Sequence, residues 1–265
     1  GAGYTALPHF SRGTPFSWIF NMESPKVGQD VRVRQAISHG IDKARLIDTV
    51  LGGVRTEATN VFSAPTPGHL SENPYPYDPA KAATLLDEAG WVLSGDVRVK
   101  DGVSLELEWY TMTDFPVYDQ MAPFVQAQLA EIGVKVNLTS QSWPGVGETL
   151  TSGAHDVGIT SLVAANATGS FNAIMSCASD SRLGGFNWSF YCNPEVDELM
   201  NAAAADPDPA TRLASWEQAS TLIMADAPYI PMVENSSHIV ARSGLSGFVF
   251  AGVDGTPIYA GVVEE

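Results

Sequence analysis

Basic residues are scarce in this sequence. It contains 14 Lys and Arg against 30 Asp and Glu, which gives a formal net charge of −16. Nucleic acid binding draws most of its affinity from cations that neutralise phosphates, and anionic lipid surfaces attract basic segments in the same way. The charge balance therefore argues against a nucleic acid partner and against an anionic membrane surface.

Long apolar runs and catalytic motifs are also lacking. No run approaches the roughly 18 apolar residues that a membrane span needs. Five histidines are scattered without metal-ligand spacing, and there is no HExxH, CxxC or GxSxG motif. The segment "GVGETL" (145–150) lacks the third glycine of a dinucleotide loop and is predicted to be a plain turn. We therefore expect binding rather than a reaction, with no metal and no cofactor.

The first residues show no targeting pattern. "GAGYTALPHF" has no basic stretch, no apolar stretch and no initiating Met. At 265 residues with 45% apolar content, the chain can still bury a substantial core. We expect it to be part of a longer protein, so that missing signals say little about its compartment.

Only two cysteines are present, Cys177 and Cys192, in a stretch rich in Ser, Gly and Asn. They are either two free thiols or a disulfide that closes this loop. We expect the disulfide, because the loop has few other means of becoming ordered and the composition is typical of exported proteins. In the chain-entropy model such a bond contributes about 3 kcal/mol.

Helix starts are clearly marked at three places. Asp42, Asp78 and Asp208 each stand at an N-cap position, and the last two are followed by a proline in the first turn. Helices are also expected over 116–133 and 193–205. Within the first of these, Pro123 is expected to kink the helix or delay its start.

A strand–helix–strand unit surrounds the helix at 116–133. Val103, Leu105, Leu107 and Trp109 alternate with polar residues before it, and "VKVNLTSQSW" (134–143) alternates after it. Such a unit is expected to pair its strands in parallel. With further strands predicted at 16–23, 155–163 and near the C-terminus, the fold class is α/β with a mixed sheet flanked by helices.

A long neutral segment follows the predicted strand "HDVGITSLV" (155–163). From Val157 to Ser179 the chain has no Asp, Glu, Lys or Arg, and we predict a loop in the part that follows the strand. Trp143, Phe171 and Trp188 lie among Ser, Gly, Pro and Asn, where turns are expected, whereas Trp109 suits a core position and a site position equally. Aromatic side chains on loops at strand ends are typical of a concave site with neutral hydrogen-bonding groups.

Five segments together resemble the family 5 extracellular solute-binding proteins, the oligopeptide, dipeptide and nickel receptors of ABC importers. In chain order they are "DVRVRQAISHGIDKARLIDTVLGG", "YDPAKAATLLDEAGW", "DGVSLELEW", "AQLAEIGVKVNL" and "FNWSFYCNPEVDELM". The resemblance covers nearly the whole chain. It implies one lobe of a two-lobed, periplasmic-binding-protein-like (type II) receptor that closes on its ligand at a hinge.

The resemblance also implies a division of the chain. Residues 1–25 resemble the strand that enters the C-terminal lobe through the hinge, 26–227 the ligand-binding lobe, and 228–265 strands returning toward a first lobe that is missing. The implied protein is a monomer outside the cytoplasmic membrane, at the periplasm or the cell surface. It is lipid-anchored at full length and delivers a small-molecule or oligopeptide-like ligand to a membrane permease.

In peptide-binding members, the strand matching 155–163 runs into a Trp and then an Asp-rich turn that holds the peptide's α-ammonium group. Aligned from Asp156, those positions are Leu162 and Ala165, so the acid is absent. Burying an ammonium group without a counter-charge costs several kcal/mol. A sugar, a blocked peptide or a metal chelate would therefore suit this chain better than an ordinary peptide.

The residues predicted to contact the ligand are of two kinds, aromatic or apolar side chains and neutral amides. Each has packing or loop structure as its alternative, and for Asn187 a turn role is the main one. The set is Leu162, Asn166, Phe171, Asn187, Trp188 and Trp143.

Two other functional classes stay open at this stage. The chain could be a lobe of a secreted hydrolase whose catalytic half is missing, which would require titratable groups converging in a cleft. It could also be an interaction module that presents one lobe to a membrane partner without a ligand. A ligand-induced rise in melting temperature would favour a receptor over that module.

Overall fold

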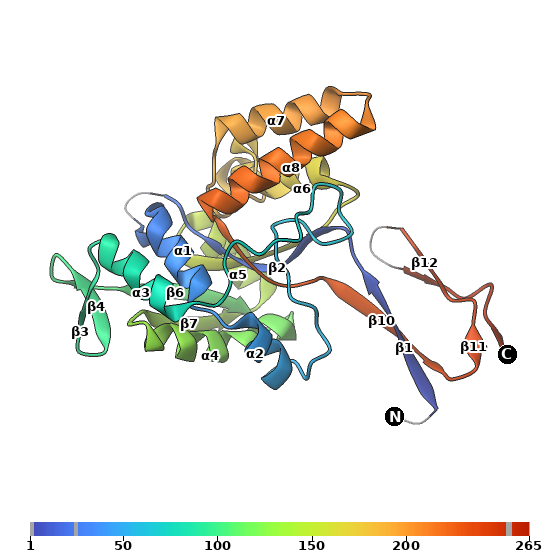
Figure 1. The fold of residues 1–265 in the computed structure, drawn as a ribbon, viewed down its shortest axis with the longest axis horizontal. Helices are drawn as coiled ribbons and strands as arrows, with labels where there is room; N and C mark the ends of the chain where they lie inside the picture. Colours follow the sequence, from blue (N-terminus) through green and yellow to red (C-terminus); the bar gives the residue numbers. More distant parts are fainter. Residues whose placement is uncertain (1–2, 24–25, 253–255, 265) are drawn as a thin grey trace.

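The structure is a computed structural model that describes residues 3–23, 26–252 and 256–264. A five-stranded sheet lies at its centre, with helices on both sides (Figure 1). The strand order is β7 (Lys135–Gln141), β6 (Glu106–Met112), β8 (Val157–Val163), β2 (Gly13–Phe20) and β9 (Tyr229–Val233).

The sheet is mixed, as predicted. Strand β6 pairs in parallel with β7 and β8, whereas β2 is antiparallel to both β8 and β9. The predicted strand–helix–strand unit is confirmed as β6, α4 (Pro116–Glu131) and β7. Helix α4 begins at Pro116 and includes Pro123, so the internal proline does not delay its start.

Eight α-helices are present in the described part of the chain. Besides α4 they are α1 (Val31–His39), α2 (Lys43–Thr49), α3 (Pro79–Glu88), α5 (Trp143–Ser152), α6 (Ala167–Ile174), α7 (Pro194–Ala205) and α8 (Pro209–Asp226). Asp42, Asp78 and Asp208 cap α2, α3 and α8, each accepting a hydrogen bond from a backbone N–H three residues later. These three predicted helix starts are confirmed.

Two segments predicted without a helix contain one. Helix α5 includes residues 145–150, so the prediction of a plain turn there is wrong; Val146 and Leu150, four residues apart, bury one face of it. Helix α6 lies within the neutral segment predicted as a loop. Its buried residues Ala167, Ser170, Phe171 and Ile174 follow helical spacing, which outweighs the low helix propensity of the segment.

Strands β1 and β10 form an extended ribbon that projects from the body (Figure 1). Strand β1 (Tyr4–Phe10) pairs antiparallel with β10 (Ser236–Arg242). At the base of the ribbon, the N–H of Ser11 donates to the carbonyl of Asn235 at 2.8 Å. Strand β2 follows directly. Its pairing shifts register between Thr14 and Ser17 against β8, and between Phe16 and Ser17 against β9. The ribbon is therefore continuous with the two strands β2 and β9.

Short elements complete the chain. A three-stranded sheet contains β3 (Val92–Ser94), β4 (Val97–Lys100) and β5 (Val103–Ser104). Beyond the ribbon, β11 (Leu245–Ser246) pairs with β14 (Val263–Glu264), and β12 (Val249–Ala251) with β13 (Thr256–Ile258). Short 3-10 turns lie at Val27–Gln29, Cys177–Ser179 and Ser181–Leu183.

The core lies between the central sheet and its helices. Trp18 of β2 and Trp109 of β6 are fully buried, and their rings meet edge to face at 5.1 Å. Trp109 is therefore a core residue rather than part of a site. Among the described residues, no helix combines the length and the apolar character that a membrane crossing requires.

Candidate binding pocket

A pocket of about 360 Å³ lies at the carboxyl ends of β6 and β8, on the edge of the sheet from which the ribbon leaves. Ligands of α/β sheets bind at this edge, because loops diverge there and leave a crevice. The lining comes from β2, β6, β8, α4, α5 and two loops: Phe16, Met112, Phe115, Tyr118, Trp143, Ile159, Thr160, Ser161, Val163, Trp188 and Asn235.

Aromatic rings make up much of the wall. Trp143 begins α5 and is 45% exposed, and its ring meets that of Trp188 edge to face at 5.7 Å. On the other side, Phe16 contacts Tyr118 at 5.6 Å and Phe115 at 6.4 Å between ring centroids. Such a wall suits apolar or planar parts of a ligand.

The polar groups of the lining are neutral. Asn235 donates from Nδ2 to Ser161 Oγ at 3.2 Å, and the hydroxyl of Tyr118 donates to the carbonyl of Thr160 at 2.6 Å. Burial raises the pKa of the Tyr118 hydroxyl far above its ordinary value, so it stays protonated. The lining formed by the described residues contains no carboxylate, imidazole or cation.

The structure brings two of the six predicted contact residues together in this pocket, Trp143 and Trp188. Trp188 is 9% exposed and donates from Nε1 to Thr151 Oγ1 at 3.1 Å. Leu162 lies on β8 between two lining residues, Ser161 and Val163, but its own side chain packs against the core because side chains alternate along a strand.

Asn166 and Phe171 lie away from the pocket. Asn166 is the N-cap of α6 and accepts a hydrogen bond at Oδ1 from the N–H of Gly169, at 2.9 Å. Phe171 belongs to α6, is 1% exposed and packs in the core. Asn166 caps the helix and Phe171 anchors it in the core, so both side chains have a role in the fold. Ala165, where the resemblance implies an acid, is exposed.

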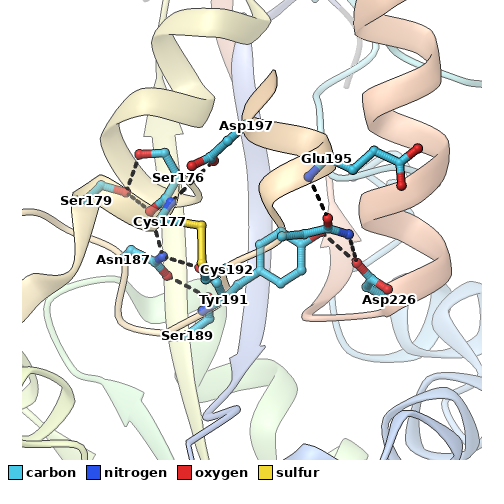
Figure 2. Close-up of a disulfide and its surroundings, with 11 residues drawn as sticks. Ser176, Cys177, Ser179, Asn187, Ser189, Tyr191, Cys192, Glu195, Asp197 and Asp226 are labelled. Carbon is cyan, nitrogen blue, oxygen red and sulfur yellow. Dashed lines mark hydrogen bonds between the residues drawn. A yellow bond between two sulfur atoms is a disulfide. The ribbon is translucent and has the colours of Figure 1, made fainter. Parts of the chain in front are cut away.

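Asn187 is a buried loop residue (Figure 2). Its Nδ2 donates to the carbonyls of Ser176 and Tyr191, at 3.1 and 2.8 Å, and Ser189 Oγ donates to its Oδ1 at 2.7 Å. The side chain thus joins two parts of the loop that holds Trp188. These contacts correspond to the turn role that the sequence analysis gives for Asn187 as the alternative to ligand contact.

The sulfur atoms of Cys177 and Cys192 are bonded in the structure, which closes the same loop across a sequence separation of 15 (Figure 2). Nearby, Asp226 on α8 accepts hydrogen bonds from the hydroxyl of Tyr191 and from Asn193 Nδ2. The loop that carries Trp188 is therefore held by a covalent bond and by buried polar contacts.

We predict that replacing both cysteines with serine lowers the free energy of unfolding by about 3 kcal/mol, because a loop of this length gains that much conformational freedom in the unfolded chain. Urea unfolding of the double variant, and of the natural chain with and without reductant, would measure it. The reduced natural chain serves as the control and should match the variant. Equal stability and equal mass with and without reductant would show that the thiols are free in solution.

The sequence analysis missed several pocket residues, above all Phe16, Phe115, Tyr118 and Asn235. Phe16 and Asn235 belong to the segments expected to cross the hinge, and proximity to the hinge was a usable signal for both. Phe115 and Tyr118 stand at the start of α4 and carry no pattern that separates them from core residues.

No metal centre is visible in the described ranges, where no three His, Cys, Asp or Glu side chains gather closely enough to hold an ion.

Known relatives resemble the chain over most of its length. Glutathione-binding protein GsiB of Salmonella typhimurium is 29% identical over 223 residues, which are 82% of this chain and 42% of that protein. GsiB of Escherichia coli K12 is 27% identical over the same share. The chain thus spans less than half the length of these relatives.

Solved structures share the fold. NikA from Brucella suis, in complex with Fe(III)-EDTA, matches with a TM-score of 0.84 and 25% identity, over all of this chain and 53% of that one. Oligopeptide-binding AppA from Bacillus subtilis, in complex with a nonapeptide, matches with a TM-score of 0.80 and 22% identity, over 96% of this chain and 51% of that one.

The family model described as "Bacterial extracellular solute-binding proteins, family 5 Middle" matches residues 4–182. The neutral pocket, the mixed sheet and the match over more than half of the sequence agree with one another. The chain belongs to family 5 of the bacterial extracellular solute-binding proteins.

Proposed function

We propose that the chain is the ligand-binding part of the substrate-binding component of an ABC importer. The pocket at the carboxyl edge of the sheet forms one wall of the ligand site, and a second lobe closes against it about the ribbon. The observation that carries the proposal is the lining itself, which combines aromatic faces with neutral hydrogen-bonding groups at the base of the ribbon.

Binding rather than turnover is supported by the chemistry of the wall. A hydrolase needs a nucleophile paired with a base, or converging acids. Ser161, the lining serine, accepts from Asn235 and has no basic partner among the described residues. The hydrolase alternative therefore finds no support in this pocket.

The ligand class is a peptide-like or other polar solute without a free ammonium group in this wall. The relatives are named for glutathione, and the similar structures contain a nonapeptide or a metal chelate. Ala165 supplies no carboxylate, so an amine placed here would lose its counter-charge. A blocked or modified peptide or a chelate meets these conditions.

We extend the proposal to the setting of the whole protein. The whole protein would work as a monomer outside the cytoplasmic membrane, held there by a lipid anchor, and would deliver its ligand to the permease of the importer. The residues 1–25 and 228–265 would lead to and from the second lobe.

We predict that Trp143→Ala weakens ligand binding by about tenfold or more, which corresponds to about 1.4 kcal/mol of lost ring contact. Glutathione, a free dipeptide and the same dipeptide N-acetylated would be titrated against the chain and followed by tryptophan fluorescence. Tyr77→Ala is the matched control, because Tyr77 is similarly exposed, at 43%, and lies outside the pocket.

The blocked dipeptide should bind more tightly than the free one. Unchanged affinity in Trp143→Ala, with binding lost in Tyr77→Ala, would show that the ligand binds outside the proposed pocket. Tighter binding of the free dipeptide would contradict the proposed ligand class.

A further inference from the structure

A half-buried arginine, Arg55, lies beside the binding pocket without an acidic partner. None of the ion pairs formed by the described residues includes it. Its Nη1 donates to the carbonyl and the hydroxyl of Ser236, the first residue of β10, at 3.1 and 3.3 Å. No hydrogen bond within the described part of the chain uses Nε or Nη2. Half of the guanidinium fork is therefore open.

Arg55 lines a second pocket, of about 540 Å³, between the end of α2 and the start of α4. Phe16 and Phe115 line this pocket and the binding pocket alike, so the two hollows adjoin across one aromatic wall. Arg55 stacks on that wall, with its guanidinium carbon 5.8 Å from the centre of the Phe16 ring. The rest of the lining is Val50, Leu51, Val54, Pro116, Val117 and Gln120.

The other cations that are buried among the described residues, Arg34, Lys43 and Arg98, are engaged by the protein itself. Arg98 pairs with Asp87 and donates to the carbonyls of Trp91 and Ile132. Arg34 donates to three backbone carbonyls, those of Gly28, Gln29 and Asp226. Lys43 pairs with Glu57 at 3.3 Å and also donates to two carbonyls. Burial lowers the pKa of Arg55, and no neighbouring carboxylate offsets that effect, although a guanidinium stays charged.

A cation partly removed from water is stabilised by an anionic partner, and the described part of the chain pairs no carboxylate with Arg55, although the net charge of the sequence is −16. A planar guanidinium with two free donors matches a carboxylate in bidentate geometry. A single cation balances a monoanion, whereas a phosphate dianion would call for a second cation, and Arg55 is the one cation among the described lining residues.

We propose that Arg55 binds a carboxylate of the transported solute, while the body of the solute occupies the adjoining aromatic pocket. The inference rests on the proposed function, because it assumes that this face of the chain is the wall of the ligand site. It adds to that proposal the charge of the ligand. The solute would then carry a carboxylate at the end near Arg55. The part of it near Ala165, where the resemblance implies an acid, would be uncharged.

The test uses a pair of probes that differ only in charge, N-acetyl-phenylalanine and N-acetyl-phenylalanine amide. Each is titrated against the ¹⁵N-labelled chain, and the Nε–Hε resonance of Arg55 is followed. We expect the acid to bind about tenfold more tightly than the amide and to shift this resonance, which the amide leaves in place. In Arg55→Gln the preference for the acid should fall to about one.

Arg45→Gln is the matched control. Arg45 stacks on Phe124 at the same distance of 5.8 Å but is exposed and lies outside both pockets, so the preference should persist in this variant. Arg55→Lys, which keeps the charge but not the fork, should retain part of it. If Arg55→Gln fails to fold, the resonance shift in the natural chain and the Arg55→Lys affinities decide the question.

The outcomes separate the two proposals. Equal binding of acid and amide, with both weakened by Trp143→Ala, would overturn the role of Arg55 and leave the proposed pocket standing. An acid preference that survives in Arg55→Gln would also overturn it. If neither probe binds, both proposals fail.

Discussion

Replacing Phe171 with alanine should lower the free energy of unfolding by about 3–5 kcal/mol, the usual range for removing a large buried ring. Phe171 is 1% exposed and fixes α6 in the core, so its loss leaves a cavity that the neighbouring side chains fill only in part. Because the ring does not line the pocket, the folded variant should bind ligand as the natural chain does. Urea unfolding and a ligand titration on the same sample measure both effects.

Trp143→Ala provides the comparison for Phe171→Ala. Trp143 is 45% exposed, and its removal should change the unfolding free energy by less than about 1 kcal/mol while weakening binding. The two variants should thus show opposite patterns. A Phe171→Ala protein of natural stability that no longer binds ligand would place Phe171 in the site after all.

A second large effect is expected from Glu234, through the pH dependence of stability. Glu234 connects β9 to β10 at the base of the ribbon and is 2% exposed. Burial raises its pKa from 4.5 to about 7, although the N–H of Ala64 donates to both carboxylate oxygens, at 3.2 and 3.3 Å. A pKa raised in the folded state favours the protonated form there.

The sign of the effect follows from proton linkage. The unfolded chain releases the Glu234 proton near pH 4.5 and the folded chain near pH 7. The stability that this group contributes is therefore complete below pH 4.5 and is lost as the pH rises through 7. At about 1.36 kcal/mol per pH unit, the loss is on the order of 3 kcal/mol.

Glu234→Gln removes this titration. The variant should match the natural chain near pH 4.5 and exceed its unfolding free energy by about 3 kcal/mol at pH 8, as measured by urea unfolding across that range. Parallel curves for the two proteins would contradict a raised pKa at Glu234.

His155 supplies an internal check on the Glu234 experiment. It is fully buried, contacts the carbonyl of Trp188 at 3.0 Å from Nε2, and has its pKa lowered by burial to about 4. Its contribution to stability is present above pH 6.5 and is lost as the pH falls through 4. The two groups act in opposite directions. In Glu234→Gln the remaining dependence should be that of His155, with stability falling toward acid, and in His155→Gln it should be that of Glu234, with stability falling as the pH rises through 7.

The elements with strong local signals could be predicted from the sequence. Asp78 followed by Pro79 fixes a helix start, and the alternation through Leu105, Leu107 and Trp109 fixes a buried strand, because both patterns act within a few residues. Helix α6 could not be predicted in this way. Its residues have weak helix propensity, and burial against the sheet stabilises it.

The candidate site was less predictable than the fold. Trp143 and Trp188 could be predicted as pocket residues because both lie among Ser, Gly, Pro and Asn, where a large aromatic ring is not expected to fill a core position. Asn166 and Asn187 are also polar residues in such segments, but in the folded chain both side chains bind backbone groups. Asn166 caps α6, and Asn187 joins two parts of its loop. Sequence alone does not tell whether an amide serves its own backbone or a ligand, since both uses require the same chemistry.

The ribbon reaches the body through two backbone crossings that are hydrogen-bonded to each other, from Ser11 to Asn235. Because this hydrogen bond joins them, the two crossings would move together rather than independently. Asn235 lies in one of these crossings and Phe16 follows the other on β2, and both residues line the pocket. If the lobes close about the ribbon as proposed, a solute in the pocket would contact residues of the hinge directly, without an intermediate path through the core.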